Sequence, residues 1–386
     1  MTTVGVVTEI KPDEHRVGLT PAGARELVAR GHRVLVQRGA GMGSAIADAE
    51  YTAQGAEIFP DAGGVFAAAE LVVKVKEPQP AEIASLRPGQ VLFTYLHLAP
   101  DPDQTRGLIR SGATCIAYET VTDRHGRLPL LAPMSEVAGQ IAVQAGAFML
   151  MRPMGGRGAL LGRVPGVAAG RVMVIGGGVA GQNAAEVARG LGASVVVLDR
   201  SIERLRELDA LWDGRIETIH SSALTIENLL PQMDLVIGAV LVAGARAPWV
   251  IRRPQLATMR RGGVLVDISI DQGGCFETSR ATTHSAPTYE VDGVLHYCVA
   301  NMPGAVPATS TYAHTNATLP YLLRLCDEGV TAALRSDPGL MRGLAVVGGH
   351  LVSEPVATSQ GLAWMPPEAA LAAVDGGLAP GAPAAA

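Results

Sequence analysis

The chain has few cysteines and lacks the sequence features of secreted, membrane-spanning and nucleic-acid-binding proteins. No C-x-x-C pair occurs, which disfavours a zinc site and a disulfide framework. Long runs of Lys or Arg are absent, and the net charge of −5 gives no electrostatic reason to expect nucleic acid or an anionic membrane as a partner. The N-terminus lacks the basic and apolar segments of a signal peptide, and no uncharged apolar window reaches the roughly 18 residues of a membrane span. We therefore expect a cytoplasmic, soluble protein without a metal, whose few thiols are buried: Cys115, Cys275, Cys298 and Cys326.

What the chain does contain is a regular alternation of strand-like and helix-like segments. Its 386 residues are long enough for about two domains. Such alternation is typical of parallel sheets with helical crossovers. The second series has the strand number expected of a dinucleotide-binding sheet. The first series of strand-like runs covers residues 4–9, 33–37, 71–75, 91–96 and 115–119, and the second covers 171–176, 194–199, 216–221, 235–240, 264–270 and 295–301.

Two long helical segments flank the second series, one beginning near a capping Ser135 and one at 316–335. The segment after the first helix, rich in Gly, is expected to be an exposed loop. The predicted class is α/β, with two doubly wound, Rossmann-like parallel-sheet domains separated by a cleft and linked by the two helices. Residues 1–130 with 308–374 would form the substrate domain, 131–307 the nucleotide-binding domain, and 375–386 a disordered tail.

The most specific motif is "VIGGGVAGQNAA", in which Gly176, Gly178 and Gly181 fit G-x-G-x-x-G between an apolar strand and a helix. The first glycine permits a tight turn, the second lets a pyrophosphate approach the backbone, and the third allows close helix–strand packing. Asp199, at the end of the next strand, favours NAD over NADP, although the neighbouring Arg200 could also accept a 2′-phosphate. Gly177 is interpreted as an extra glycine. The alternative is a doubly wound fold that binds no dinucleotide.

Four polar residues follow strands at the edge where ligands bind in such sheets: Arg16, Lys76, His97 and Asp271. Arginine can bind a carboxylate bidentately, lysine supplies a compact charge, and histidine exchanges protons near neutral pH. Together they suit an oxidoreductase that acts on a small 2-oxo or 2-amino acid. Taken singly, the two cations could be solvated surface charges and His97 a structural histidine. Lys74 is interpreted as such a surface charge, and Asp267 as a capping carboxylate.

Several motifs together resemble the alanine dehydrogenase family: "RVGLTPAG", "LVVKVKEP", "LFTYLHLA", "LPLLAPMSEVAG", "VIGGGVAGQNAA", "VDISIDQGGCFE" and "YCVANMPGAVPATST". The similarity extends over about residues 4–365. It implies NAD-dependent, reversible oxidative deamination of L-alanine to pyruvate and ammonia by a homohexamer. Two other functions stay open. One is the soluble NAD(H)-binding subunit of a proton-translocating transhydrogenase, and the other is a dehydrogenase of a related small amino acid.

The resemblance also implies roles for individual residues. Arg16 and Lys76 would hold the substrate, His97 would be the acid/base group, and Asp271 would be the second catalytic group. Contacts to NAD are implied for Ser135, Gly176, Gly178, Val179, Ala180, Gly181, Asp199, Arg204, Ser221, Val240, Leu241, Ile268, Val299, Asn301 and Met302.

Overall fold

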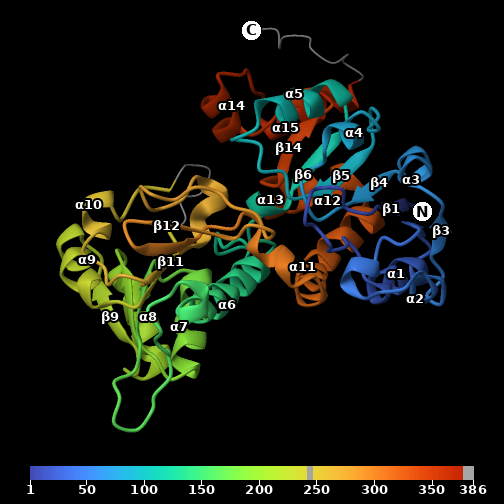
Figure 1. The fold of residues 1–386 in the computed structure, drawn as a ribbon. Coiled ribbons are helices and arrows are strands. Elements are labelled where there is room, and N and C mark those ends of the chain that lie inside the picture. Colours follow the sequence, from blue (N-terminus) through green and yellow to red (C-terminus); the bar gives the residue numbers. More distant parts are fainter. Residues whose placement is uncertain (241–246, 377–386) are drawn as a thin grey trace. The chain divides into compact units, whose positions relative to one another are not determined.

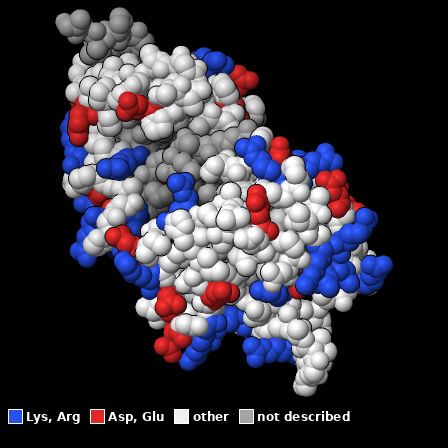
Figure 2. Space-filling model, turned by 90° about the vertical axis from the view of Figure 1, so that its left-hand side faces the viewer, with Lys and Arg blue, Asp and Glu red and all other residues white. Residues whose placement is uncertain are grey.

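The computed structural model describes residues 1–240 and 247–376 (Figure 1). The chain divides into two compact units, and each is described by itself below. Unit 1 comprises Met1–Pro133 and the described part of Val306–Ala386, and unit 2 comprises Met134–Ala305. The predicted cleft between two domains stays a prediction. On the face drawn in Figure 2, basic and acidic side chains are both scattered among uncharged residues.

Unit 1 is built on an eight-stranded sheet in the order β15-β14-β6-β5-β4-β1-β2-β3. Strands β1 to β6 pair in parallel, and β14 and β15 form antiparallel pairs at one edge of the sheet. The strands are β1 (Thr3–Val6), β2 (Arg33–Gln37), β3 (Glu57–Phe59), β4 (Leu71–Val73), β5 (Val91–Thr94), β6 (Thr114–Ala117), β14 (Leu344–Val347) and β15 (His350–Leu351). The helices are α1 (Pro21–Ala29), α2 (Asp48–Thr52), α3 (Ala62–Ala68), α4 (Pro80–Ile83), α5 (Pro102–Ser111), α11 (Pro307–Glu328), α12 (Val330–Ser336), α13 (Pro338–Met341), α14 (Glu354–Gln360) and α15 (Pro367–Asp375), with the 3-10 turns η1 (Met42–Ser44) and η2 (Tyr118–Thr120).

Unit 2 contains a seven-stranded sheet in the order β12-β13-β11-β10-β7-β8-β9, in which β12 is the antiparallel strand. The strands are β7 (Arg171–Ile175), β8 (Ser194–Asp199), β9 (Glu217–His220), β10 (Leu235–Gly238), β11 (Val264–Asp267), β12 (Thr288–Val291) and β13 (Val294–Tyr297). The helices are α6 (Ala132–Met149), α7 (Val179–Gly190), α8 (Ile202–Trp212), α9 (Ala223–Leu229) and α10 (Arg253–Leu256), with the 3-10 turns η3 (Arg152–Met154), η4 (Leu230–Gln232), η5 (Ile268–Gln272) and η6 (Met302–Ala305).

Both sheets repeat one strand order. Numbered within each unit, the parallel strands run 3-2-1-4-5-6, which is the doubly wound order of dinucleotide-binding domains. In this order the chain reverses direction across the sheet between β1 and β4 in unit 1, and between β7 and β10 in unit 2. Ligands bind outside the carboxyl ends of the strands at such a switch point. The predicted fold class is confirmed, and each unit has one expected binding edge.

Burial of both faces explains why the strands read as unbroken apolar runs. In β7, Val172 and Val174 belong to one core cluster together with Ala184 of α7. Met173 and Ile175 belong to a second cluster, which lies on the opposite face of the sheet. Alternate residues of a strand point to opposite faces, so helices must cover both sides. Figure 1 shows helices on both sides of each sheet.

The sheets are mixed rather than purely parallel, which corrects the sequence prediction. Strand β14 is a short buried run in the C-terminal region, beyond both predicted series of strands. Strand β12 is a half-exposed edge strand without a continuous apolar run. Strand β3 has only three residues and also lacks a buried pattern. Short, partly exposed edge strands such as β12 and β3 have few buried residues. Neither the alternation of apolar residues nor the hydropathy of the sequence therefore reveals them.

The two long helices begin earlier than predicted. Helix α6 starts at Ala132, so Ser135 lies inside its first turn and is not the N-cap. The prediction of a single helix over 316–335 is wrong, because Gly329, with a φ of 82°, separates α11 from α12. At the other end, α15 extends to Asp375, one residue into the predicted tail, and residues 377–386 lie outside the described part.

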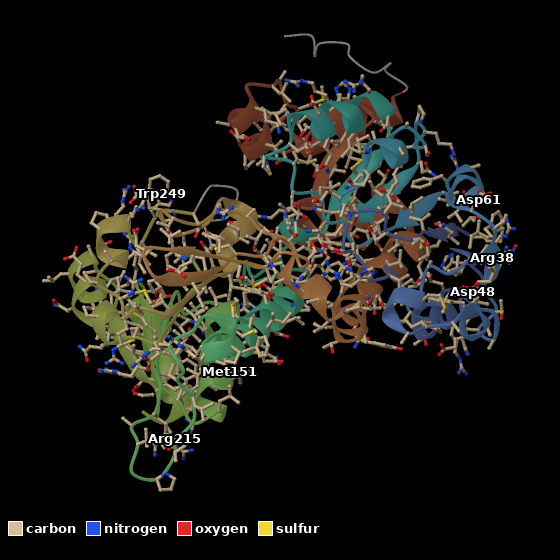
Figure 3. The ribbon with its side chains drawn as sticks, viewed as in Figure 1. Arg38, Asp48, Asp61, Met151, Arg215 and Trp249 are labelled. Atoms are coloured by element: carbon tan, nitrogen blue, oxygen red, sulfur yellow. The ribbon has the colours of Figure 1, made fainter. Side chains whose placement is uncertain are left out.

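The segment after α6 confirms the predicted exposed loop. It follows Met151, which is labelled in Figure 3, and its side chains Leu160, Val164 and Val167 are largely exposed. All four cysteines are buried and none is in a disulfide. Within residues 1–240 and 247–376, no helix has the length and hydropathy needed to cross a membrane, and no His, Cys, Asp or Glu cluster could hold a metal ion.

Candidate active site

The switch point of unit 1 is occupied by a buried ion triad. Lys74 directly follows β4, and its side chain is fully buried. Its Nζ donates to Glu9 Oε2 at 2.9 Å and to Glu82 Oε1 at 2.6 Å. Burial alone would lower the pKa of Lys74, but the two carboxylates outweigh it and raise that pKa. The interpretation of Lys74 as a surface charge is therefore wrong, and the residue is a permanently charged part of the core.

The triad also fixes the main chain around Lys76. Glu9 accepts the backbone N–H of Val75 at 2.7 Å and that of Lys76 at 3.3 Å. The carbonyl of Lys76 accepts the hydroxyl of Thr94 at 2.9 Å. The path of the chain beyond β4 is thus held by a carboxylate from the neighbouring strand end, which positions the Lys76 side chain.

Lys76 is itself buried, and its Nζ lies 3.6 Å from Glu77 Oε2. Glu77 also binds the ammonium of Lys11. Burial would raise the pKa of Glu77, but the cations Lys76 and Lys11, in that order, outweigh it and lower the pKa to about 2. His97 also lowers the pKa of Glu77, so this carboxylate interacts electrostatically with two of the predicted site residues.

Arg16 lies in the loop after β1 and is 2% exposed. Its Nε donates to Glu14 Oε1 at 2.7 Å and its second terminal nitrogen donates to Glu14 Oε2 at 2.5 Å. Burial opposes the charge, but the bond to Glu14 prevails and the pKa of Arg16 is raised. The backbone N–H of Val17 donates to Thr311 Oγ1 on α11 at 3.2 Å, which anchors the loop. Glu14 therefore holds one edge of a guanidinium that stays charged.

His97 lies three residues beyond β5 and is half-buried. Its φ of 47° is in the left-handed region, which non-glycine residues rarely adopt. The imidazole stacks on Tyr95, with ring centroids 5.8 Å apart and an interplanar angle of 6°. The hydroxyl of Tyr95 donates to the carbonyl of Leu130 at 2.5 Å. The chain therefore leaves β5 in a strained turn that places the His97 ring against a fixed aromatic surface.

One buried histidine of this unit was missed in the sequence. His314, on α11, is fully buried with ring centroids 4.8 Å from Tyr118 and 5.4 Å from Tyr95. Among the described residues, neither of its ring nitrogens has a hydrogen-bond partner. Burial, together with the nearby Arg16 cation, lowers the pKa of His314 to about 3. Tyr95 thus neighbours Arg16 and His97, and Glu77 interacts with Lys76 and His97. The neutral imidazole of His314 lies against the same Tyr95.

At the switch point of unit 2 there is a turn that only glycine allows. Gly176 has a φ of 101°, and a Cβ there would lie 2.4 Å from the carbonyl oxygen of Ala239. A Cβ on Gly181 would lie 1.8 Å from the carbonyl oxygen of Gly176. The first distance reflects the tight turn, and the second reflects the close helix–strand packing, that the sequence motif requires.

Gly178 differs from its neighbours because a Cβ there would meet nothing within 4 Å. It is the exposed N-cap of α7, and no side chain caps the helix at this position. The N–H groups of a helix's first turn lack intrahelical acceptors and carry partial positive charge. Val179 and Ala180, which begin this turn, are at least partly exposed. The start of α7 therefore fits the pyrophosphate of a dinucleotide.

Gly177 is more than an extra glycine. Its backbone N–H donates to Asp199 Oδ2 at 2.7 Å, and a Cβ there would lie 2.7 Å from Leu208 Cδ1. Asp199 Oδ1 accepts the N–H of Ser201 at 2.8 Å, so both carboxylate oxygens are bound by main chain. Arg204 Nε donates to the carbonyl of Gly177 at 2.7 Å. The turn, the β8 end and α8 are therefore locked together.

Some of the other predicted cofactor residues are connected to this turn by contacts of the main chain. A Cβ on Gly139 would lie 2.2 Å from the carbonyl oxygen of Ala180, and Ser135 lies one turn earlier on α6. Ser221 donates its N–H to the carbonyl of Asp199 at 2.8 Å. The carbonyl of Val240 accepts the hydroxyl of Ser269 at 2.8 Å. Ile268 is half-buried, the side chains of Val299 and Met302 pack in the core, and Leu241 lies outside the described residues.

Asp271 is on the turn η5 after β11 and is exposed. Its Oδ1 accepts the backbone N–H of Asn301 at 3.1 Å, and Asn301 has a φ of 61°. The buried Asp267 caps the same turn by accepting the N–H of Ser269 at 2.9 Å and of Cys275 at 2.8 Å. The interpretation of Asp267 as a capping carboxylate is confirmed. Asp271 and Asn301 come together although 30 residues separate them in sequence.

Several known proteins are similar to this chain in sequence and fold. The family model described as "Alanine dehydrogenase/PNT, N-terminal domain" matches residues 5–138, and "Alanine dehydrogenase/PNT, C-terminal domain" matches residues 142–354. An alanine dehydrogenase of Halomonas elongata is 57% identical over 362 residues, covering 94% of this chain and 98% of the relative. A solved L-alanine dehydrogenase structure is 48% identical with a TM-score of 0.89, covering 93% of this chain and 99% of that one. A transhydrogenase structure from Sinorhizobium meliloti is 26% identical with a TM-score of 0.77, covering 91% and 99%.

The two doubly wound units, with a glycine turn in one and buried cations in the other, define a class of α/β oxidoreductases that use a nucleotide cofactor. Both family models match, and together they span most of the sequence. The chain belongs to the alanine dehydrogenase/PNT family.

Proposed function

We propose that this protein catalyses the NAD-dependent, reversible oxidative deamination of L-alanine to pyruvate and ammonia. The observation that carries the proposal is the cluster at the carboxyl edge of the unit 1 sheet. There the buried guanidinium of Arg16 and the imidazole of His97 both neighbour Tyr95, and the buried ammonium of Lys76 interacts with Glu77, which His97 also affects. A small anionic substrate with an oxygen or nitrogen next to its carboxylate matches this set. The relatives named alanine dehydrogenase, at 48–57% identity over nearly the whole chain, support the same reaction.

The cofactor would be held by unit 2. The first turn of α7 from Gly178 would bind the pyrophosphate, and Asp199 would accept hydrogen bonds from the adenosine ribose. Ser135, Arg204, Ser221, Val240, Ile268 and Asn301 lie around the same edge and are proposed to contribute further contacts. With NAD held there, the cofactor would supply the hydride acceptor for alanine oxidation and, as NADH, the hydride donor for the reverse reaction.

The chain's own residues orient the substrate and move protons. Arg16, held on one edge by Glu14, binds the substrate carboxylate, and Lys76 binds the carbonyl oxygen of pyruvate. His97 exchanges a proton with that oxygen as ammonia adds or water departs. Asp271 assists the accompanying proton transfers.

A test is NADH oxidation, followed at 340 nm, after mixing the protein with pyruvate and ammonium. We expect oxidation only when both co-substrates are present, and slower oxidation with NADPH in place of NADH. A panel of 2-oxo acids of increasing size then defines the side chain that is accepted. If the protein binds NADH but oxidises none with any 2-oxo acid and ammonium, the proposal is wrong. The nucleotide-binding subunit of a transhydrogenase would then be the better assignment, as the 26% identical structure suggests.

We further propose that the protein works in the cytoplasm as a homohexamer, as the family resemblance implies. Light scattering of the purified protein measures the oligomer directly. A mass near that of a single 39.9 kDa chain would contradict this part of the proposal without affecting the reaction.

A further inference from the structure

The peptide groups on both sides of His97 are bound by side chains from three other elements. Glu119 Oε1 accepts the backbone N–H of His97 at 2.7 Å, and both Glu119 oxygens lie 3.2 Å from the N–H of Leu96. Gln104 Nε2 donates to the backbone carbonyl oxygen of Leu96 at 2.8 Å, and Gln360 Nε2 donates to that of Leu98 at 2.7 Å. The turn that carries the imidazole is therefore held by η2, α5 and α14 rather than by the sheet.

This clamp acts where the backbone is least favourable. His97 has a φ of 47°, a conformation that costs free energy for a residue with a Cβ and persists only when neighbouring groups impose it. Two N–H groups that converge on one carboxylate make charge-assisted bonds, which are stronger than bonds between neutral groups. Of the side-chain bonds to this turn described above, the one to Glu119 Oε1 involves the N–H of His97 itself.

The clamp also has a rigid base. Glu119 lies two residues beyond β6, which pairs in parallel with β5 through Thr94 and Ala117. Two neighbouring strand ends thus fix both the carboxylate and the turn it binds. The imidazole then has one further fixed neighbour, the ring of Tyr95, on which it stacks.

We infer that Glu119 is the positioning residue for His97: its carboxylate holds the left-handed turn that presents the imidazole to the substrate. The inference depends on the proposed function, in which His97 exchanges a proton with the substrate oxygen. Every bond assigned here to Glu119 goes to main chain, so its effect on the reaction passes through the position of the His97 ring.

The experiment is a double-mutant cycle with Glu119→Ala, His97→Ala and the double variant, assayed for reductive amination of pyruvate. We expect Glu119→Ala to lower kcat about tenfold or more, with KM for pyruvate changed less than about twofold. The reason is that a misplaced acid/base group slows the chemical step more than it weakens substrate binding. Glu119→Gln, which keeps one acceptor oxygen, should recover part of that loss. In the His97→Ala background, Glu119→Ala should change kcat by less than about twofold.

A matched control is Glu50→Ala, which removes a carboxylate that accepts a backbone N–H, that of Ala47, elsewhere in unit 1. This variant should leave kcat unchanged. Thermal unfolding and circular dichroism show whether each variant folds, and Glu119→Gln serves if Glu119→Ala does not. Equal losses of kcat from the Glu119 change in both His97 backgrounds would overturn the positioning role alone. A normal rate for His97→Ala would instead overturn the role of His97 in the proposed function, and the inference with it.

Discussion

The switch point of the strand order lies beside Glu9 and Lys74 in unit 1, and beside Gly176 and Ala239 in unit 2. The strand order is the same in both units. At the first switch point, charged side chains fill the space and are compensated by buried partners. At the second, glycines without side chains let main-chain atoms approach each other closely.

The difference follows from what each edge is proposed to bind. A pyrophosphate can be bound by main-chain N–H groups, provided that no Cβ keeps it away. A small carboxylate substrate requires cationic side chains, and buried cations need counter-ions such as Glu9, Glu14 and Glu77. Unit 1 should therefore be sensitive to loss of charge, and unit 2 to the addition of atoms.

The largest effect is expected from removing the central charge of unit 1. Lys74→Met leaves Glu9 and Glu82 buried without their cation, and breaking a buried ion pair costs about 3–5 kcal/mol of unfolding free energy. Denaturant unfolding at pH 7 measures this loss. The triple variant that also carries Glu9→Gln and Glu82→Gln removes the uncompensated charges and should regain part of the stability. Equal stability of Lys74→Met and the wild type would contradict the argument that unit 1 depends on paired charge.

For unit 2 the corresponding change is the addition of one methyl group. Gly181→Ala would place a Cβ 1.8 Å from the carbonyl oxygen of Gly176 and should cost about 1–3 kcal/mol of unfolding free energy. NADH binding should weaken at the same time because the turn must shift. These effects are measured by denaturant unfolding and by fluorescence titration with NADH.

Gly178→Ala is the matched control for the glycine turn. Its Cβ meets nothing within 4 Å, so stability should be unchanged, while the methyl group occupies space proposed for the pyrophosphate and should weaken NADH binding. Loss of stability in Gly178→Ala, or normal NADH binding in both variants, would show that the two glycines do not have these separate roles.

The same contrast explains how much of the molecule the sequence could predict. Gly176, Gly178 and Gly181 form a local pattern, because a tight turn acts on neighbouring residues, and so this edge of unit 2 was expected in detail. The capping role of Asp267 is local in the same way. The strand ends near Lys76 and His97 were also visible, since buried strands read as apolar runs.

The compensating groups of unit 1 could not be predicted in this way. Glu9 and Lys74 are 65 residues apart in sequence, and Glu119 reaches back 22 residues to His97. Nothing in the local pattern around Lys74 separates a buried, paired lysine from a solvated one. His314 lies on α11, nearly 300 positions after Arg16, and only the fold brings it to Tyr95. Partners of buried charges are set by tertiary contacts, which a single sequence does not display.

A third prediction concerns the pH dependence of unit 1. Burial, with Arg16 nearby, lowers the pKa of His314 to about 3, whereas an unfolded histidine titrates near 6.5. Between these values the unfolded state binds one more proton than the folded state, so the unfolding free energy falls as the pH falls. The slope from this group is about 1.4 kcal/mol per pH unit.

His314→Leu should remove that slope from the pH dependence of stability. Comparison of urea unfolding for wild type and variant between pH 6.5 and about 4.5 measures the difference. Parallel curves for wild type and His314→Leu would show that the imidazole is accessible to protons in the folded state.

The smallest effect is expected at Asp199. This residue combines the features of the two switch points, because it is a charged side chain whose carboxylate is bound by main-chain N–H groups. Its two oxygens accept the N–H groups of Gly177 and Ser201 at 2.7 and 2.8 Å, and Asp199→Asn leaves one acceptor, so about 1 kcal/mol of stability should be lost. The change also removes the charge that repels a 2′-phosphate, next to Arg200. The ratio of kcat/KM for NADH to that for NADPH should therefore fall by about tenfold. An unchanged ratio would mean that the main-chain frame of the turn, and not the charge of Asp199, sets the preference between the two nucleotides.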